Sequence, residues 1–302
     1  MFASALVAAL AQQIVLPLGG APQQVERLPA PIAHAGPQWA RACAGSDDWE
    51  KPAPPVRIHG NSYLVGTCGI AAILVTGSDG HILIDAGTEP GAETVAANIK
   101  ALGFKLTDVK YLLHSHEHFD HVGGTALLQK LTGATLIASA PAARVFASGT
   151  ATPDDPQAGM HLPLRIANVG RVIADGETVR LGNLLLTAMA TPGHTPGALS
   201  WSWESCDGGV CRSIVFADSL SAVSRDNYRF SAHPQYLAAF RAGIAKVGAS
   251  RCEILLTPHP SASGLPAKLA AGKPWVDPAA CRSHAATLNA KLDERLAKET
   301  AK

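Results

Sequence analysis

The sequence predicts a layered α/β protein in which helices cover the faces of sheets. Two observations carry this prediction. Strand-like runs alternate with segments of helical spacing along most of the chain, and hairpin turns separate some of the strands. The 302 residues are 47% apolar and 16% charged, which indicates a folded protein that is long enough to bury a substantial core.

The predicted elements begin near Val56 and continue through the C-terminal part of the chain. Runs of β-branched and apolar residues predict strands at 63–65, 70–76, 81–85, 110–113, 135–138, 171–174, 184–190, 199–203, 213–216 and 253–257. Helical spacing predicts helices at 93–102, 125–131, 141–146, 235–247 and 278–296. Segment 150–163 has Pro and Gly without periodicity, so we expect an irregular loop, and loops of this length are often functional.

We expect a single domain over residues 56–302, preceded by two segments of different character. Residues 1–20 contain a run of small apolar residues that is too short to cross a bilayer. A signal peptide is favoured over a disordered extension, although no Lys or Arg precedes the run. Residues 21–55 are rich in Pro, Ala and Gln and predict an extended arm.

The charge pattern argues against large polyanionic partners. Lys and Arg total 25 against 24 for Asp and Glu, which gives a net charge of +1, and no five like charges run together. We therefore expect neither nucleic acid nor a membrane as a partner. We also expect a monomer.

The six cysteines contain no C-x-x-C pair, so a zinc-ribbon site is not indicated. The alternative to disulfides is six buried free thiols in a cytosolic enzyme. A sequential pairing closes only modest loops, and two cysteines bracket a turn between strand-like runs. The predicted pairs are Cys43 with Cys68, Cys206 with Cys211 and Cys252 with Cys281. Such bonds persist in oxidising compartments, so a periplasmic or secreted protein is expected.

A cluster of imidazoles follows the strand that ends at Leu113. Four of the 12 histidines fall within eight positions, and an aspartate lies among them: His114, His116, His118, Asp120 and His121. The loops at the ends of strands are where α/β folds place their sites. Imidazoles one residue apart can point the same way, while Asp120 and His121 turn towards a second centre. The sequence therefore predicts two metal positions.

Two further histidines occupy similar places. His194 lies in the segment TPGHTPG after one predicted strand, and His259 lies in TPHP after another. Either histidine alone would more often be a turn or core residue. Beside the upstream cluster, they become the candidates that complete the two metal shells.

These motifs together resemble the metallo-β-lactamase superfamily, and more narrowly its subclass B3 metallo-β-lactamases. The resemblance covers roughly residues 56–281 and rests on the H-x-H-x-D-H run, the GHTPG loop and an Asp-Ser-Leu-Ser segment followed by PHP. The first motif is shared with glyoxalase II and lactonases. Two features narrow the resemblance to subclass B3. They are the presence of both His121 and His259, and the lack of a metal-binding cysteine near Ser219. It implies a four-layer αβ/βα sandwich, the metallo-β-lactamase fold.

The resemblance also implies a ligand set and a reaction. Two Zn²⁺ ions would be held, one by His116, His118 and His194 and the other by Asp120, His121 and His259. The implied reaction is hydrolysis of the β-lactam amide of penicillins, cephalosporins and carbapenems by a metal-bound hydroxide. Asp120 would be the catalytic residue that orients this nucleophile.

The sequence indicates the residues that contact substrate less specifically than it indicates the metal ligands. In the family, serines at the place of Ser219 and Ser221 help to bind the substrate carboxylate, but serines at a strand end also often satisfy local backbone groups. Gln157 is a candidate for the lip of the site, or else a solvated loop amide. His114 is expected to pack. Asp85 is expected either to orient a histidine ligand or to form a turn.

Two other functions remain open from the sequence. The first is another hydrolase of the same superfamily that acts on a thioester or a lactone, in which Asp218 is a conceivable metal-bridging residue. The second is a noncatalytic zinc-stabilised binding protein. That class does not account for an open dinuclear site, because structural zinc is usually closed by four protein ligands.

Overall fold

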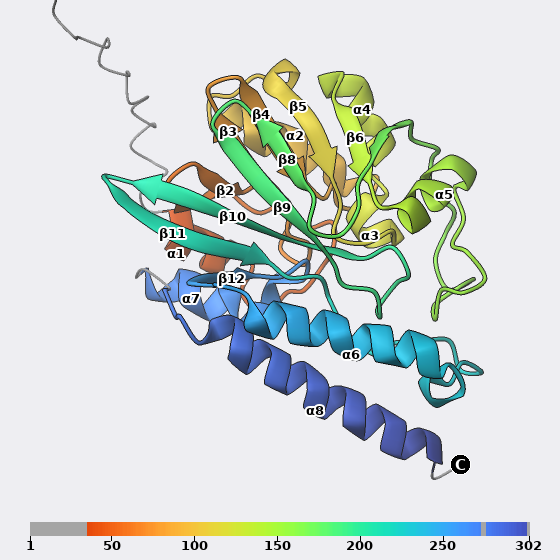
Figure 1. Ribbon diagram of the computed structural model, residues 1–302. Helices are drawn as coiled ribbons and strands as arrows, with labels where there is room; N and C mark the ends of the chain where they lie inside the picture. Colours follow the sequence, from red (N-terminus) through yellow and green to blue (C-terminus); the bar gives the residue numbers. More distant parts are fainter. Residues whose placement is uncertain (1–34, 273–275, 301–302) are drawn as a thin grey trace, which may run out of the picture.

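The computed structural model describes residues 35–272 and 276–300 and contains two sheets packed face to face, with helices on their outer faces (Figure 1). The predicted layered α/β sandwich is confirmed. The predicted signal segment and residues 21–34 of the predicted arm lie outside the described residues.

The first sheet has seven strands in the order of the chain. They are β1 (Val56–His59), β2 (Ser62–Leu64), β3 (Ile73–Gly77), β4 (Gly80–Ile84), β5 (Val109–Leu113), β6 (Thr135–Ala138) and β7 (Val169–Val172). Pairing is antiparallel from β1 to β4 and parallel from β4 to β7. The parallel strands therefore end at the same edge of this sheet.

The second sheet has five strands in the order β12-β11-β10-β9-β8. They are β8 (Thr178–Leu181), β9 (Leu184–Ala190), β10 (Leu199–Asp207), β11 (Val210–Phe216) and β12 (Ile254–Leu256). Strands β10 and β11 form a long antiparallel hairpin, whose turn residues Gly208 and Gly209 both have positive φ. Only β12 pairs in parallel, against β11, within the part of the sheet that the structure describes.

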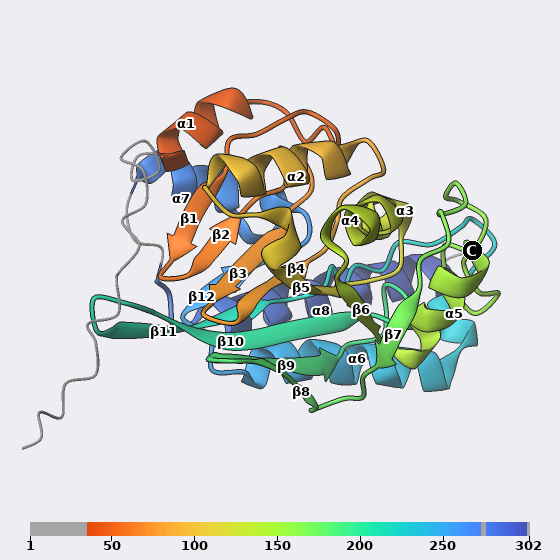
Figure 2. The same ribbon diagram turned by 90° about the horizontal axis from the view of Figure 1, so that it is seen from above.

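Helices cover both outer faces (Figure 2). They are α1 (Ala35–Ala42), α2 (Gly91–Ala101), α3 (Phe119–Val122), α4 (Thr125–Thr132), α5 (Ala140–Ser148), α6 (Pro234–Ala249), α7 (Leu265–Ala271) and α8 (Ala280–Thr300). In the first sheet, β4 is buried on both faces, so it is apolar at successive positions. Its Ile82 and Ile84 face the second sheet, whereas Leu83 faces α2.

The arm differs from its prediction. It was expected to be extended, but Ala35–Ala42 form helix α1, which packs on α7, and this part of the prediction was wrong. The helix carries a single large apolar side chain, Trp39, which is 1% exposed in the core. Its stability therefore comes from tertiary burial, which the local periodicity does not reveal.

The three predicted disulfides are confirmed, and all six cysteines are paired. Cys43–Cys68 attaches the end of α1 to the loop after β2, Cys206–Cys211 closes the tip of the β10–β11 hairpin, and Cys252–Cys281 joins the segment before β12 to α8. Among the described helices, none has the combination of length and apolarity that a bilayer span requires.

Candidate metal centre

The predicted metal ligands lie at the ends of three strands. Strand β5 leads into the His116–His121 segment, β9 leads into the loop of His194, and β12 leads into His259. In the first segment, His116 and His118 alternate along extended backbone before α3 begins at Phe119, and α3 then carries Asp120 and His121. The structure brings all six predicted ligands together.

Three imidazoles form a first candidate metal position. His116, His118 and His194 each offer one nitrogen, and these atoms lie within 4.8 Å of one another. Their ring centroids are 4.6–5.1 Å apart. His116 Nε2 is buried and has no hydrogen-bond partner among the described residues, as a nitrogen reserved for a metal would be.

Asp120, His121 and His259 form a second cluster of candidate metal donors. Asp120 Oδ2 lies 3.0 Å from His121 Nε2 and 3.3 Å from His259 Nε2, and the two nitrogens are 3.3 Å apart. Zinc bonds of 2.0–2.1 Å in a tetrahedron place neighbouring ligand atoms about 3.3 Å apart. This triangle of donors therefore fits a zinc ion. The two positions adjoin, because the rings of His116 and His121 are 4.2 Å apart.

The second ring nitrogen of each imidazole faces an oxygen atom, and every one of these contacts except that of His121 is a hydrogen bond. The contacts are His116 Nδ1 to Asp218 Oδ1 (2.8 Å), His118 Nε2 to Asp155 Oδ2 (3.0 Å), His121 Nδ1 to Asp85 Oδ2 (3.5 Å), His194 Nδ1 to the Ser221 carbonyl (3.0 Å) and His259 Nδ1 to the Gly69 carbonyl (3.2 Å). Asp85 was a sequence candidate for this role. It also accepts the backbone N–H of Ser115 at 2.6 Å and has a φ of 63°.

Comparisons with known proteins agree with this geometry. A family model described as the metallo-beta-lactamase superfamily matches residues 65–211. The solved structure of the MIM-2 metallo-β-lactamase is 55% identical to the chain with a TM-score of 0.85, and the alignment covers 88% of this chain and 98% of that one. The chain belongs to the metallo-β-lactamase superfamily. As a member, it is a metal-binding hydrolase.

Other similar proteins include two further solved metallo-β-lactamases and a curated hydrolase that matches over part of its length. MIM-1 from Novosphingobium pentaromativorans is 47% identical, with a TM-score of 0.85 and coverage of 87% of this chain and 98% of that one. MEM-A1, a subclass B3 metallo-β-lactamase from a soil metagenome library, is 42% identical, with a TM-score of 0.79 and coverage of 84% and 99%. A hydroxyacylglutathione hydrolase from Bradyrhizobium sp. (strain ORS 278) is 30% identical over 134 residues, which are 44% of this chain and 42% of that protein. The match thus spans less than half the length of this curated relative.

Burial and neighbouring charges together set the pKa values in the metallo-β-lactamase site. Burial lowers the pKa of His116 and of His194 well below the usual range, and the neighbouring imidazoles lower both further. Both rings therefore keep a lone pair for a metal. Burial opposes ionisation of Asp120, but His121 overcomes this and holds the pKa of Asp120 well below its usual value. For His121, burial is outweighed by Asp120 and Asp85, which raise its pKa to about 10.

Glu117 joins two of the metal-bearing loops. Its buried carboxylate accepts hydrogen bonds from the hydroxyl of Thr195 and the backbone N–H of Gly197, both at 2.7 Å. A Cβ at Gly197 would lie 2.7 Å from that carboxylate, so only glycine fits. Burial raises the pKa of Glu117 to about 7. This contact places the GHTPG loop, and hence His194, against the segment that carries His116 and His118.

The candidate substrate residues lie beside the first metal position. Gln157 Nε2 is 3.3 Å from His194 Nε2, and Ser221 Oγ is 3.0 Å from His194 Nδ1. Ser219 Oγ is buried, without a hydrogen-bond partner in the described part of the chain. His114, by contrast, packs: its Nε2 accepts the backbone N–H of Ser139 and its ring contacts Phe146.

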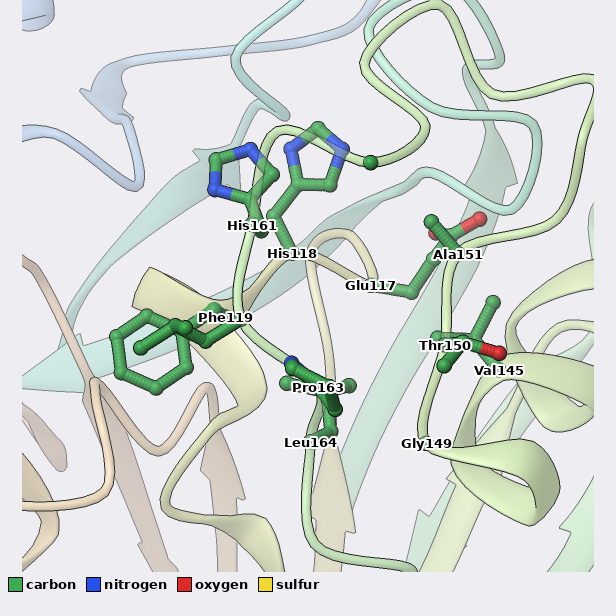
Figure 3. Close-up of a pocket in the computed structure, with 12 residues that line it drawn as sticks. Glu117, His118, Phe119, Val145, Gly149, Thr150, Ala151, His161, Pro163 and Leu164 are labelled. Carbon is green, nitrogen blue, oxygen red and sulfur yellow. The ribbon is translucent and has the colours of Figure 1, made fainter.

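Two residues of this region were missed by sequence reasoning, Asp155 and His161. Both lie in the irregular loop that the sequence predicted, where a carboxylate and an imidazole were the available signals. The His161 ring lies 4.5 Å from that of His118, and the two close one end of a cavity of about 330 Å³ (Figure 3). Glu117, Phe119 and Leu164 are among its other lining residues. The loop therefore borders the metal centre directly.

Proposed function

We propose that the chain is a dizinc β-lactamase that hydrolyses the amide bond of penicillins, cephalosporins and carbapenems. One observation carries the proposal: two adjoining triads of metal donors, of which five are buried and His259 is partly exposed, in a chain that is 55% identical to the MIM-2 metallo-β-lactamase over 98% of that protein. All six donors are nitrogen or carboxylate oxygen, which suits zinc.

The proposed ligand sets are those of the two triads. His116, His118 and His194 would hold one zinc ion, and Asp120, His121 and His259 would hold the other. When bound, a zinc pair supplies Lewis acidity and an activated water at neutral pH. Asp120 is kept ionised, so its carboxylate can accept a hydrogen bond from the attacking water and orient that water towards the substrate carbonyl.

Hydrogen-bond donors on the chain would hold the substrate. His194 donates its Nδ1–H to the Ser221 carbonyl, so its Nε2 carries the lone pair and accepts from the Gln157 amide. Once a metal takes that lone pair, the Gln157 amide is free to donate to a substrate oxygen. Ser219 and Ser221 supply hydroxyl groups on the opposite loop and would bind the carboxylate of a β-lactam.

A thioester or lactone hydrolase is the alternative, and the curated hydroxyacylglutathione hydrolases give it a basis. In that interpretation Asp218 would bridge the metals. Both of its carboxylate oxygens are already used, since Oδ1 contacts His116 Nδ1 and Oδ2 accepts the backbone N–H of Leu220. The geometry favours Asp218 as the residue that orients His116, and hence favours the β-lactamase.

We further propose that the enzyme works as a monomer in the periplasm or outside the cell. Three disulfides support this location, because such bonds persist in oxidising compartments.

The test is an assay of zinc-loaded protein with a carbapenem, a thioester and a lactone, each with and without a chelator. We expect carbapenem hydrolysis that the chelator abolishes and added zinc restores. Thioester or lactone turnover without β-lactam turnover would overturn the proposal. One tightly held zinc ion per chain and no activity after zinc addition would instead indicate a noncatalytic binding protein.

A further inference from the structure

Asp155 lies in the irregular loop and makes two contacts with its buried carboxylate, which is fully enclosed. Oδ2 accepts the Nε2–H of His118 at 3.0 Å, and Oδ1 accepts the backbone N–H of Gln157 at 2.7 Å. A carboxylate only accepts hydrogen bonds, so the proton of a neutral His118 lies on Nε2. Asp155 therefore leaves the lone pair of His118 on Nδ1, the atom available to a metal.

The loop around Asp155 is fixed from the opposite side of the site. Arg225 follows the Asp218–Ser221 segment and donates from Nη1 to the Asp155 carbonyl at 2.9 Å. Its backbone N–H also donates to the carbonyl of Pro156 at 3.0 Å. These contacts hold both peptide groups next to the carboxylate, so its position is set by packing against a second segment.

Gln157 is oriented by the same arrangement. Its backbone is held by Asp155, and its side-chain Oε1 accepts the Nε2–H of His161 at 3.2 Å. Because a carboxamide with its oxygen engaged in this way turns its NH₂ group away, Nε2 faces His194. One carboxylate thus connects a ligand of the first metal position to a donor that faces the same position.

We propose that Asp155 is a positioning residue that couples metal binding by His118 to the placement of Gln157. A metal on Nδ1 of His118 favours the tautomer that donates to Asp155, and Asp155 in turn holds the loop that carries Gln157. By reciprocity, a correctly placed loop strengthens metal binding. The effect on substrate rests on the proposed function, whereas the effect on metal and loop does not.

The test compares Asp155→Asn with Asp154→Asn. The asparagine at position 155 keeps the shape of the side chain but has one acceptor oxygen for two donors. Asp154 is exposed and next in the chain, so its substitution changes the charge equally and serves as the matched control. Zinc affinity is measured by competition with a chromophoric chelator. We expect binding that is about 10- to 100-fold weaker in Asp155→Asn and unchanged in Asp154→Asn.

Loop placement is measured by hydrogen exchange of residues 150–163 with and without zinc. Zinc should slow this exchange in the wild type and in Asp154→Asn, and should have little effect in Asp155→Asn. Equal zinc affinity in Asp155→Asn and the wild type would overturn the proposal, and so would loop protection by zinc that survives the substitution.

If Asp155→Asn does not fold, the same measurements are made on Arg225→Met. This substitution removes the Arg225 side-chain contact to the loop without touching His118. We expect several-fold weaker zinc binding and reduced loop protection, and wild-type values would overturn the proposal.

Kinetics separate this coupling from the proposed function. Gln157→Ala should raise KM for a carbapenem while leaving zinc affinity as in the wild type, and Asp155→Asn should change both. If the wild type does not hydrolyse β-lactams but the zinc and exchange results are as expected, the coupling stands and the proposed function fails.

Discussion

Strands β10 and β11 run side by side as a long hairpin (Figure 1). Polar residues at its two ends lie in opposite environments. At the metal end, Asp218 and Ser200 are fully buried and joined by a hydrogen bond from the Asp218 backbone N–H to Ser200 Oγ at 2.9 Å. At the tip, Asp207 is exposed, and its ion pair with Arg57 at 3.1 Å lies in solvent beside the Cys206–Cys211 disulfide.

Along this one pair of strands, residues expected to affect catalysis lie at one end and residues expected to affect only stability lie at the other. Burial of Asp218 and Ser200 is energetically tolerable because each has a hydrogen-bond partner, and Asp218 also orients His116. Ion pairs at the tip are screened by water and contribute little. We therefore expect substitutions at the metal end to change catalysis, and substitutions near the tip to change stability alone.

The largest effect is expected for Asp120→Ala. Loss of the ionised carboxylate removes both a metal donor and the group that orients water, so kcat/KM for a carbapenem should fall by about 10²- to 10⁴-fold. The unfolding transition of the metal-free variant should remain cooperative, which shows that the fold persists. Unchanged kinetics would contradict the role of Asp120.

A smaller effect at the same end is expected for Asp218→Asn. The amide cannot accept from both His116 Nδ1–H and the Leu220 backbone N–H, so His116 loses part of its orientation. Zinc affinity should fall by about 10- to 100-fold, measured by chelator competition. Wild-type affinity in this variant would show that Asp218 does not orient His116.

At the tip, the double substitution Cys206→Ser and Cys211→Ser should lower stability without altering kinetics. The bridge spans five residues, and the chain-entropy model assigns about 2 kcal/mol to a loop of that length. The free energy of unfolding is measured in urea, and kcat/KM is measured on the same preparation. A drop in kcat/KM would break the separation between the two ends.

The smallest effect is expected for Glu253→Gln, beside β11. The backbone N–H of Ser213 and the side chain of Arg212 lower the pKa of Glu253 from 4.5 to about 2. On acidification the unfolded chain takes up this proton first, so its stabilisation is present above pH 4.5 and is lost between pH 4.5 and 2. The urea midpoint of the variant should therefore fall less between pH 5 and pH 3 than that of the wild type. Parallel curves would exclude this contribution.

Local sequence predicted the strands that have a distinct apolar run. The bounds expected for β6 and β9 match the structure, because their apolar runs end where polar loop residues begin. Strand β8 was missed: its pattern TVRL is mostly exposed and lies on a sheet edge. Helix α1 was missed because its stability depends on Trp39 packing against residues far away in the chain.

The candidate site shows the same contrast between features that local sequence reveals and features that depend on tertiary packing. Its metal donors were recognisable because imidazoles at short spacing follow a strand, a pattern that local sequence displays in full. Asp155 was not recognisable, because its contact with His118 joins residues 37 positions apart and depends on how the loop folds back. Sequence therefore identifies the candidate metal donors, whereas the groups that orient them require the tertiary structure.

The disulfide that fixes the arm lies next to a residue that contacts a candidate metal ligand. The Cys43–Cys68 bridge ends one residue before Gly69, whose carbonyl holds the imidazole of His259. A chain synthesised where thiols stay reduced would lack this restraint beside a metal ligand. Thiol oxidation should accordingly precede full metallation during biogenesis, and the choice of expression host becomes a determinant of how much zinc the purified enzyme carries.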